Sequence, residues 1–385
     1  MVLPMKGNYI LLISLLFSVG LFAQTEKNTL EYSGQLSAWS QYTPDITTDF
    51  WLGGRYIPQL NYKNPLKAEH LIDFELSANI LGEMGAQLFD QATFNGKVKP
   101  YRAWMRYSNN RTEIRLGLQK INFGSSQMFR PLMWFDQMDP RDPLQLTDGV
   151  WGLLGRYYFQ NNANVWIWGL YGNKNRKGWE IAPVSKTHPE VGGRIQLPIP
   201  HGETALSYHF RMVDFNSLSQ ALPVILNPVA ENRLGIDTRL DVVVGLWLEA
   251  SWTSLTKNWG MITHQEMITI GTDYTFGIGN GITTTFEQMI FSYDQSAFAF
   301  ANTANFSGLS LSYPVGLSDN LSAMTYYDWT NHDSYFFLNW QKQFNHISFY
   351  VMGYLNPRTY ALPGQMSEMN RFSGKGLQMM LVWNH

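Results

Sequence analysis

The segment 120–148 carries the residue types best suited to hold a charged solute. It reads Met-Phe-Arg-Pro-Leu-Met-Trp-Phe-Asp and then Asp-Pro-Arg-Asp-Pro, so aromatic and sulfur side chains stand beside arginines and carboxylates. The planar donor fork of arginine matches a carboxylate, and this pairing can bind a solute or hold a loop. A long segment this rich in apolar residues is typical of a functional loop and not of a disordered one. Its charged candidates are Arg130, Arg141, Asp136, Asp139 and Asp142.

A second set of arginines lies at alternate positions of the segments around this loop. Residues two apart in a strand share a face, and neighbouring strands lie about 4.8 Å apart, so these arginines are expected to form one basic arc. The set consists of Arg102, Arg106, Arg115, Arg156, Arg194, Arg211 and Arg239. Acids on the same face fall mainly elsewhere, at Asp73, Glu75, Glu249, Asp273, Glu287 and Asp328.

An acidic loop opposite a basic arc has two interpretations, which are compatible. The two charges can set up a transverse field that orients dipolar or anionic solutes at a constriction. Alternatively, the loop carboxylates can pair with the wall arginines and pin the loop in place.

Catalytic and metal chemistry find no support in the sequence. The chain has no cysteine, its histidines fall mostly at expected strand ends, and His209 stands beside Arg211 without a nucleophile set. We find no metal-ligand spacing and no phosphate-binding loop. We therefore expect no enzyme activity and no cofactor. The net charge of −2 gives no reason to expect a nucleic-acid partner.

The elements that must position these residues are strands. Apolar and polar residues alternate along most of the chain, for example from Leu71 to Ile80 and from Arg111 to Gln119. About eighteen strands are expected, although sixteen also fit; each has about the length of a tilted membrane-spanning strand. They fall near 30–41, 50–62, 69–81, 98–108, 111–119, 149–159, 163–172, 189–198, 203–213, 232–242, 244–255, 265–276, 281–292, 304–313, 320–330, 334–344, 346–356 and 373–384.

The connections alternate between short and long. Turns such as 108–110, 160–162 and 344–345 are short and contain Asn, while 82–97, 120–148 and 173–188 are long. This alternation is typical of transmembrane barrels, which have short periplasmic turns and longer extracellular loops.

The composition also favours a membrane barrel. Charged residues make up 15% and aromatic residues 15% of the chain, as suits a surface that faces lipid. Aromatic residues recur at expected strand ends, where they would form interfacial girdles. Examples are Tyr107, Tyr157, Tyr158, Phe159, Trp329, Trp340, Phe344, Tyr350 and Trp383. Residues 1–23 resemble a cleaved signal peptide, with Lys6 before an apolar stretch, and 24–385 would form a single barrel.

On these residues the chain resembles the large bacterial outer-membrane porins. It is more loosely similar to eighteen-stranded specific channels and alginate-export-type barrels. The resemblance lies in the strand Ile114–Gln119, the following Pro/Asp-rich loop and the return strand 149–152. It implies an all-β, antiparallel up-and-down transmembrane barrel whose long third loop folds into the lumen. It also implies that Arg115, Arg130, Arg141 and Arg156 line a constriction, and that the barrel is a monomer or a homotrimer in outer-membrane lipid. The C-terminus departs from the pattern, because Trp383 is followed by two further residues.

We therefore expect a porin-like channel for the passive passage of small hydrophilic solutes, with anionic or sugar-like ones favoured by the arginines. Two alternatives remain open. A barrel for polysaccharide export or surface attachment would have a plugged lumen and a basic extracellular rim. A closed structural subunit of an outer-membrane complex would have a polar stripe on its outer wall.

Overall fold

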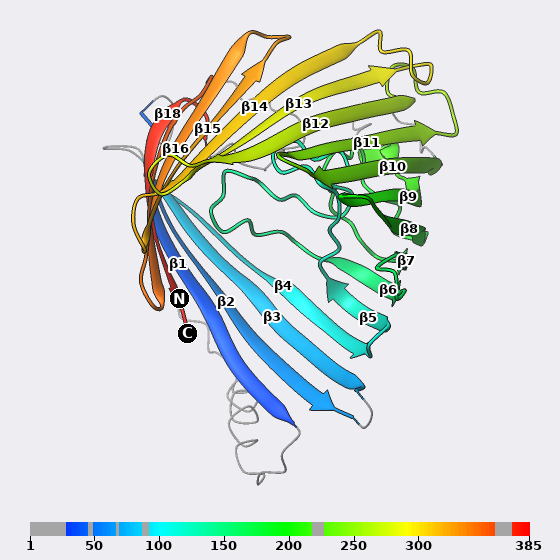
Figure 1. Ribbon diagram of the computed structural model, residues 1–385, viewed down its shortest axis with the longest axis horizontal. Helices are drawn as coiled ribbons and strands as arrows, with labels where there is room; N and C mark the ends of the chain where they lie inside the picture. Colours follow the sequence, from blue (N-terminus) through cyan, green and yellow to red (C-terminus); the bar gives the residue numbers. More distant parts are fainter. Residues whose placement is uncertain (1–27, 45–48, 67–68, 87–91, 218–226, 359–371) are drawn as a thin grey trace, which may run out of the picture.

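The chain forms a single closed β-barrel. The computed structural model describes residues 28–44, 49–66, 69–86, 92–217, 227–358 and 372–385. Each strand pairs in antiparallel fashion with the next along the chain, and β1 pairs with β18 to close the eighteen-stranded sheet (Figure 1). The strands are β1 Thr29–Tyr42, β2 Phe50–Pro65, β3 Leu71–Ala86, β4 Ala92–Ser108, β5 Thr112–Gln119, β6 Val150–Tyr158, β7 Asn164–Leu170, β8 Glu190–Ile199, β9 Gly202–Val213, β10 Val229–Asp241, β11 Gly245–Leu255, β12 His264–Phe276, β13 Ile282–Asp294, β14 Thr303–Pro314, β15 Asp319–Asp328, β16 Asp333–Gln343, β17 Ile347–Leu355 and β18 Lys375–Asn384.

The eighteen predicted strands are confirmed, and most of their ends agree within a few residues. The described part of the chain also has one short 3-10 helix, η1, at Phe215–Ser217. None of the helices in the described ranges is long and apolar enough to span a membrane. The expected signal peptide, 1–23, lies outside the described residues.

The two faces of the strands differ as the alternation predicts. On β10, Leu234 and Ile236 are exposed on the outer surface, whereas Arg233 before them and Asp237 after them are buried inside. Apolar residues face outward in the same way on the other strands, which gives the barrel an apolar exterior that suits lipid contact. One aromatic assignment is wrong: Tyr350, placed in the interfacial girdle, faces inward and is buried with Met352 and Tyr354.

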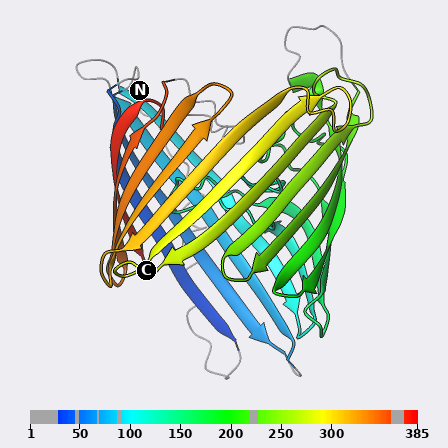
Figure 2. The same ribbon diagram turned by 45° about the horizontal axis from the view of Figure 1, so that its top comes forward.

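The connections differ between the two ends of the barrel. The turns on one end are short in every case, such as 109–111 and 344–346, and the strands run obliquely between the two ends (Figure 2). The predicted long connection 82–97 is wrong, because β3 continues to Ala86 and β4 begins at Ala92. Glycines at 82, 85 and 96 hide the alternation there, since they present no side chain to either face.

The segment between β5 and β6 lies inside the ring of strands (Figure 1). Many of its side chains are buried, and they include Ile121, Phe123, Phe129, Leu132, Trp134 and Phe135. The predicted inward fold of the third loop is therefore confirmed. We refer to residues 120–149 as the inner loop.

Candidate functional site in the barrel lumen

One wall carboxylate binds three successive backbone amides of the inner loop. Glu287, on the inner face of β13, accepts hydrogen bonds from the N–H groups of Gln127 (2.6 Å), Met128 (3.0 Å) and Phe129 (2.6 Å). Trp247 of β11 donates its indole N–H to the same carboxylate at 3.0 Å. Glu287 is fully buried. Four buried donors converge on this one side chain, so the loop is firmly attached here.

A second carboxylate, Glu249 of β11, acts in the same way. It accepts the N–H of Ser126 (2.8 Å) and the N–H of Leu132 (2.7 Å), and it is also fully buried. Gly124 approaches this carboxylate so closely that a Cβ would lie 2.4 Å from Oε2, and its φ is +103°. Only glycine combines that φ with that approach without strain.

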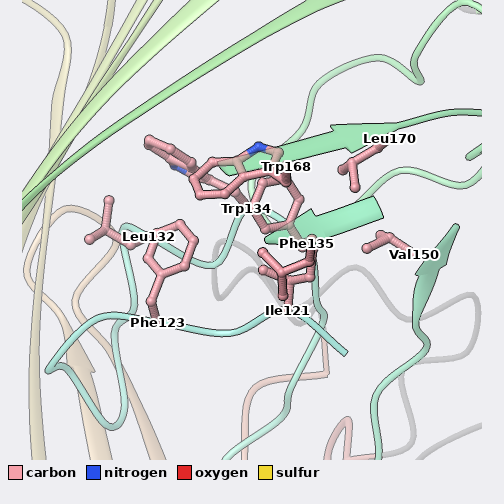
Figure 3. Packing of buried hydrophobic residues seen from close by; sticks show 9 residues of the cluster. Ile121, Phe123, Leu132, Trp134, Phe135, Val150, Trp168 and Leu170 are labelled. Carbon is pink, nitrogen blue, oxygen red and sulfur yellow. The ribbon is translucent and has the colours of Figure 1, made fainter. Parts of the chain in front are cut away.

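Apolar packing fixes the first half of the inner loop against the wall on its own side. Phe123, Trp134 and Phe135 pack with Trp168 and Leu170 of β7 (Figure 3). Phe135 meets Trp168 edge-on with ring centroids 5.4 Å apart. Aromatic side chains of this size contribute most of the burial energy of such a cluster.

The tip of the loop reaches the opposite wall. Met128 and Phe129 pack in a buried cluster with Met289 of β13, Phe306 of β14 and Tyr326 of β15. Gly308 of β14 leaves the space for them, because a Cβ there would lie 3.0 Å from the Phe129 ring. The inner loop therefore crosses the lumen from one wall to the other.

The second half of the loop packs near the junction of the last and first strands. Leu144 lies against a buried cluster that contains Trp39, Tyr350 and Met380. The guanidinium of Arg141 lies over the rings of Phe337 (5.4 Å) and Phe372 (5.0 Å).

The loop carboxylates do not bind the wall arginines in the predicted way. Asp136 pairs with Arg130 at 3.4 Å, and Asp139 pairs with Arg141 at 2.6 Å, so both acids neutralise arginines of the loop itself. Asp142 accepts the backbone N–H of Leu144 at 3.0 Å. The predicted pinning is therefore wrong for Asp136 and Asp139: wall carboxylates hold loop amides instead.

The C-terminal end of the loop does contact basic wall residues. Asp148 pairs with Lys99 of β4 at 2.5 Å, and Arg102 donates to the carbonyl of Thr147 at 3.0 Å. Burial favours the neutral form of Asp148, but the hydrogen bonds and the charge of Lys99 outweigh it and lower the pKa of Asp148. Burial lowers the pKa of the nearby Lys177, whose ammonium group donates to the carbonyl of Gly149.

Three arginines of the predicted arc meet at a single acid. Glu113 of β5 lies 3.0 Å from Arg115, 3.4 Å from Arg156 and 3.9 Å from Arg106, and Arg106 also pairs with Asp73 at 2.6 Å. The three arginine side chains keep between 15% and 27% of their surface exposed. We call Arg106, Arg115 and Arg156 the arginine cluster.

Tryptophan rings flank the arginine cluster. The guanidinium of Arg115 lies 4.6 Å from the ring centroid of Trp104, and that of Arg156 lies 3.8 Å from Trp166. Stacking on an aromatic face holds a guanidinium in place and leaves its edge free to bind an anion.

A bulge extends the basic wall along β4. The pairing between β3 and β4 shifts register at Ser77/Ala78. Because of this shift, Lys97 and Lys99 share the inner face with Arg102 and Arg106, although Lys99 and Arg102 are three positions apart and would lie on opposite faces of a regular strand. The sequence analysis missed both lysines.

Arg239 of the arc is partly exposed and pairs with Asp241 at 3.1 Å and Asp273 at 3.2 Å, whereas Arg194 and Arg211 are buried in ion pairs. Arg194 makes two hydrogen bonds to Asp237, and Arg211 makes two to Glu231. Arg211 also lies 2.8 Å from Glu180, which in turn pairs with Arg233 at 3.1 Å. These groups are almost fully buried and their charges are paired within the protein, as in a structural ion-pair network.

His209 belongs to the packing around the inner loop. Its Nδ1 accepts the indole N–H of Trp168 at 3.1 Å, so its Nε2 carries the proton and donates to Glu190 at 3.2 Å. Phe135 of the loop contacts the imidazole edge-on. In the described residues no group of His, Asp and Glu has the arrangement of a metal site.

Several solved structures of other proteins have a similar fold. Acinetobacter baumannii OccAB1 is 8% identical, with a TM-score of 0.56 over 93% of this chain and 95% of that one. OccAB4 from the same organism is 10% identical, with a TM-score of 0.55 over 94% and 98%. OmpT, an outer-membrane protein of Vibrio cholerae in its trimer form, is 10% identical, with a TM-score of 0.53 over 94% and 100%.

The chain has the porin fold. No protein-family model and no curated protein matches its sequence. At identities this low, the likeness to these structures concerns the architecture alone.

Proposed function

We propose that the chain is an outer-membrane channel through which small hydrophilic solutes diffuse down their gradient, with anions preferred. The arginine cluster is the observation that supports this proposal most directly. Its three guanidinium groups remain partly exposed beside the inner loop, and they share two carboxylates, Glu113 and Asp73. A partly hydrated basic wall lowers the energy of an anion that leaves bulk water.

The charge balance of this wall supports an anion preference. Over β3 to β6 four arginines and two lysines of the inner face stand against four carboxylates of the same strands and Asp148 of the inner loop, so the wall keeps a net positive charge. The basic residues are Arg102, Arg106, Arg115, Arg156, Lys97 and Lys99, and the carboxylates of the strands are Asp73, Glu75, Glu83 and Glu113. Each guanidinium group of the arginine cluster already contacts a protein carboxylate, so it would bind a solute weakly enough for the solute to leave.

The other predicted constriction residues have supporting roles in this proposal. The inner loop is shaped by two ion pairs of its own, Arg130 with Asp136 and Arg141 with Asp139. The wall is stiffened by the ion pairs of Arg194 and Arg211. Asp142 orders the turn before Leu144. Lipid contacts the apolar outer surface, and solutes contact the arginine cluster.

A closed structural barrel is the second candidate, because the inner loop contacts opposite walls of the lumen. Planar-bilayer recording under a salt gradient separates the two. An open channel gives ion-permeable events with a reversal potential on the anion side, whereas a closed barrel gives no events.

Arginine variants test the proposed anion preference. Arg115→Ala and Arg156→Ala are expected to lower the anion-to-cation permeability ratio severalfold, because each removes one positive charge from the path. Arg111→Ala is the matched control, since Arg111 lies in the short turn before β5 and is exposed. A permeability ratio that is unchanged in both cluster variants would contradict the proposal.

A further inference from the structure

The wall opposite the arginine cluster is polar but uncharged near the short turns. Strands β5 and β14 are nine places apart in a ring of eighteen, so β14 to β17 face β4 to β6 across the lumen (Figure 1). Between the contacts of the inner loop and the short turns, eight side chains of β14 to β17 point inward, and each carries a hydroxyl or an amide. They are Ser310, Ser312, Asn320, Ser322, Asn339, Gln341, Gln343 and Ser348. We call this set the neutral wall.

The neutral wall and the arginine cluster lie at a similar distance from the short turns. Gln341 stands two residues before the end of β16, as Arg106 does on β4 and Arg156 on β6, and these three strands end in short turns on the same side of the barrel. Leu338 and Trp340 are exposed on the outer face of β16, so Gln341 faces the lumen. A solute at this level therefore has guanidinium groups on one side and amides on the other.

The polar groups of the neutral wall bind one another only weakly. Gln341 donates to Gln343 and to the hydroxyl of Tyr350 at 3.4 Å in both cases, and Asn339 donates to Ser322 Oγ at 3.5 Å. Hydrogen bonds of this length are weak, so a solute can replace them. Amides and hydroxyls both donate and accept, as the alcohol groups of a solute require.

Aromatic stacking is not available to a solute on this wall. Tyr326, Tyr335 and Tyr350 point inward from β15 to β17, but all three are buried in the clusters that hold the inner loop. Recognition at the neutral wall therefore depends on hydrogen bonds.

We propose that the channel selects hydroxylated carboxylates, such as sugar acids, over carboxylates of the same charge that lack hydroxyl groups. This selection rests on the anion channel proposed above. The carboxylate binds at the arginine cluster, and the hydroxyl groups exchange hydrogen bonds with the neutral wall. An anion without hydroxyls binds the arginines equally well, but its hydrocarbon displaces water from amides that are then left without partners.

Reversal potentials of single channels in planar bilayers test this selection. Glucuronate and cyclohexanecarboxylate have rings of similar size and the same charge, and the permeability of each is measured against chloride. The channel is expected to be severalfold more permeable to glucuronate, although glucuronate is the larger ion. A glucuronate permeability equal to or below that of cyclohexanecarboxylate would overturn the selection and leave the anion channel standing. A channel without preference for chloride over potassium would overturn both.

Two variants of the neutral wall locate the selection. Gln341→Leu and Asn320→Leu each remove one amide and no charge, so each is expected to lower the glucuronate-to-cyclohexanecarboxylate permeability ratio severalfold and to change the chloride-to-potassium ratio much less. Gln288→Leu is the matched control, because Gln288 lies on the outer face of β13 between the exposed Phe286 and Ile290. Heat-modifiable migration on a gel verifies that each variant is folded.

The variants can also contradict the proposal. A glucuronate-to-cyclohexanecarboxylate ratio that stays at the native value in both neutral-wall variants would exclude these amides as the source of the selection. An equal fall of this ratio in Gln288→Leu would do the same, because that side chain does not face the lumen.

Discussion

Glu287 Oε2 accepts the backbone N–H of Phe129 at 2.6 Å, across 158 residues of sequence. The same carboxylate binds the two preceding amides, so a single side chain holds three consecutive residues of the inner loop to β13. Since backbone amides are present whatever the side chains are, this attachment leaves the loop side chains free to pack on the walls.

Glu287→Ala removes the acceptor of four hydrogen bonds in a buried site. We expect the barrel to lose about 3 kcal/mol of stability, because buried donors are left unsatisfied. We also expect larger fluctuations of the open-channel current, since the loop tip is released. Thermal unfolding in detergent and single-channel recording measure the two effects. Asp319→Asn is the control, because Asp319 lies at the far end of β15 and pairs only with groups there. Equal stability and equal current noise in Glu287→Ala and Asp319→Asn would contradict this role.

Gly124→Ala tests the close approach at Glu249. The new Cβ would lie 2.4 Å from Oε2 at a φ of +103°. A side chain in that backbone region costs about 1–2 kcal/mol before the clash is counted, so a loss of roughly 2–3 kcal/mol is expected. Gly277→Ala is the control, because nothing lies within 4 Å of the added Cβ. A melting temperature in Gly124→Ala no lower than in Gly277→Ala would show that the loop is not held tightly at this point.

Phe135→Ala tests the apolar attachment of the first half of the loop. The ring is buried against Trp168 and His209, so its removal is expected to cost about 3–5 kcal/mol. Phe135→Leu retains most of the volume and should cost much less. Chemical unfolding of the barrel in lipid vesicles gives both values. Similar losses for the two variants would mean that the cavity left by the ring does not determine the effect.

Glu113→Gln changes selectivity in the opposite direction from the arginine variants. Its carboxylate is the one that Arg106, Arg115 and Arg156 share, so the neutral amide leaves the cluster more positive. We expect a higher anion-to-cation permeability ratio from reversal potentials. Glu203→Gln, at the exposed end of β9, is the matched control. A ratio that falls in Glu113→Gln would contradict the proposed role of the cluster.

The ion pair between Asp148 and Lys99 is expected to make the stability of the barrel depend on pH. The folded pKa of Asp148 is lowered, so its contribution to stability is complete above its unfolded value of about 3.9 and is lost as the pH falls below it. Between pH 6 and pH 3 the melting temperature should fall less in Asp148→Asn than in the native chain. Asp241→Asn, whose side chain is 64% exposed, should show the native dependence. An unchanged pH dependence in Asp148→Asn would exclude the pair as a contributor.

The sequence predicted the strands because lipid and water on opposite faces impose a period of two, which Leu234 to Asp237 show clearly. It failed at 82–97, where glycines interrupt that period, and at Tyr350, where an aromatic residue lies inside. The basic arc was predicted from the alternation of faces along each strand, and Glu113 shares the face of Arg115 because it stands two residues before it. Glu113 contacts arginines of three different strands because the side chains extend across the sheet. The spacing of residues along the chain does not predict such contacts.

The loop attachment could be predicted only in part. The sequence identified Glu249 and Glu287 as inward acids, but their partners are backbone amides, and amides carry no sequence signal. The β4 lysines were missed because the bulge at Ser77/Ala78 changes the parity of the strand. A register shift of this kind depends on the neighbouring strand and not on local residue types.

Liposome swelling tests the central proposal most directly. Vesicles that contain the purified barrel are placed in equal concentrations of a small organic carboxylate, a neutral sugar and an organic cation of similar size. The proposed channel predicts the fastest swelling with the carboxylate and slower swelling with the carboxylate in Arg115→Ala. Vesicles that do not swell in any of the three, or that swell fastest with the cation, would contradict it.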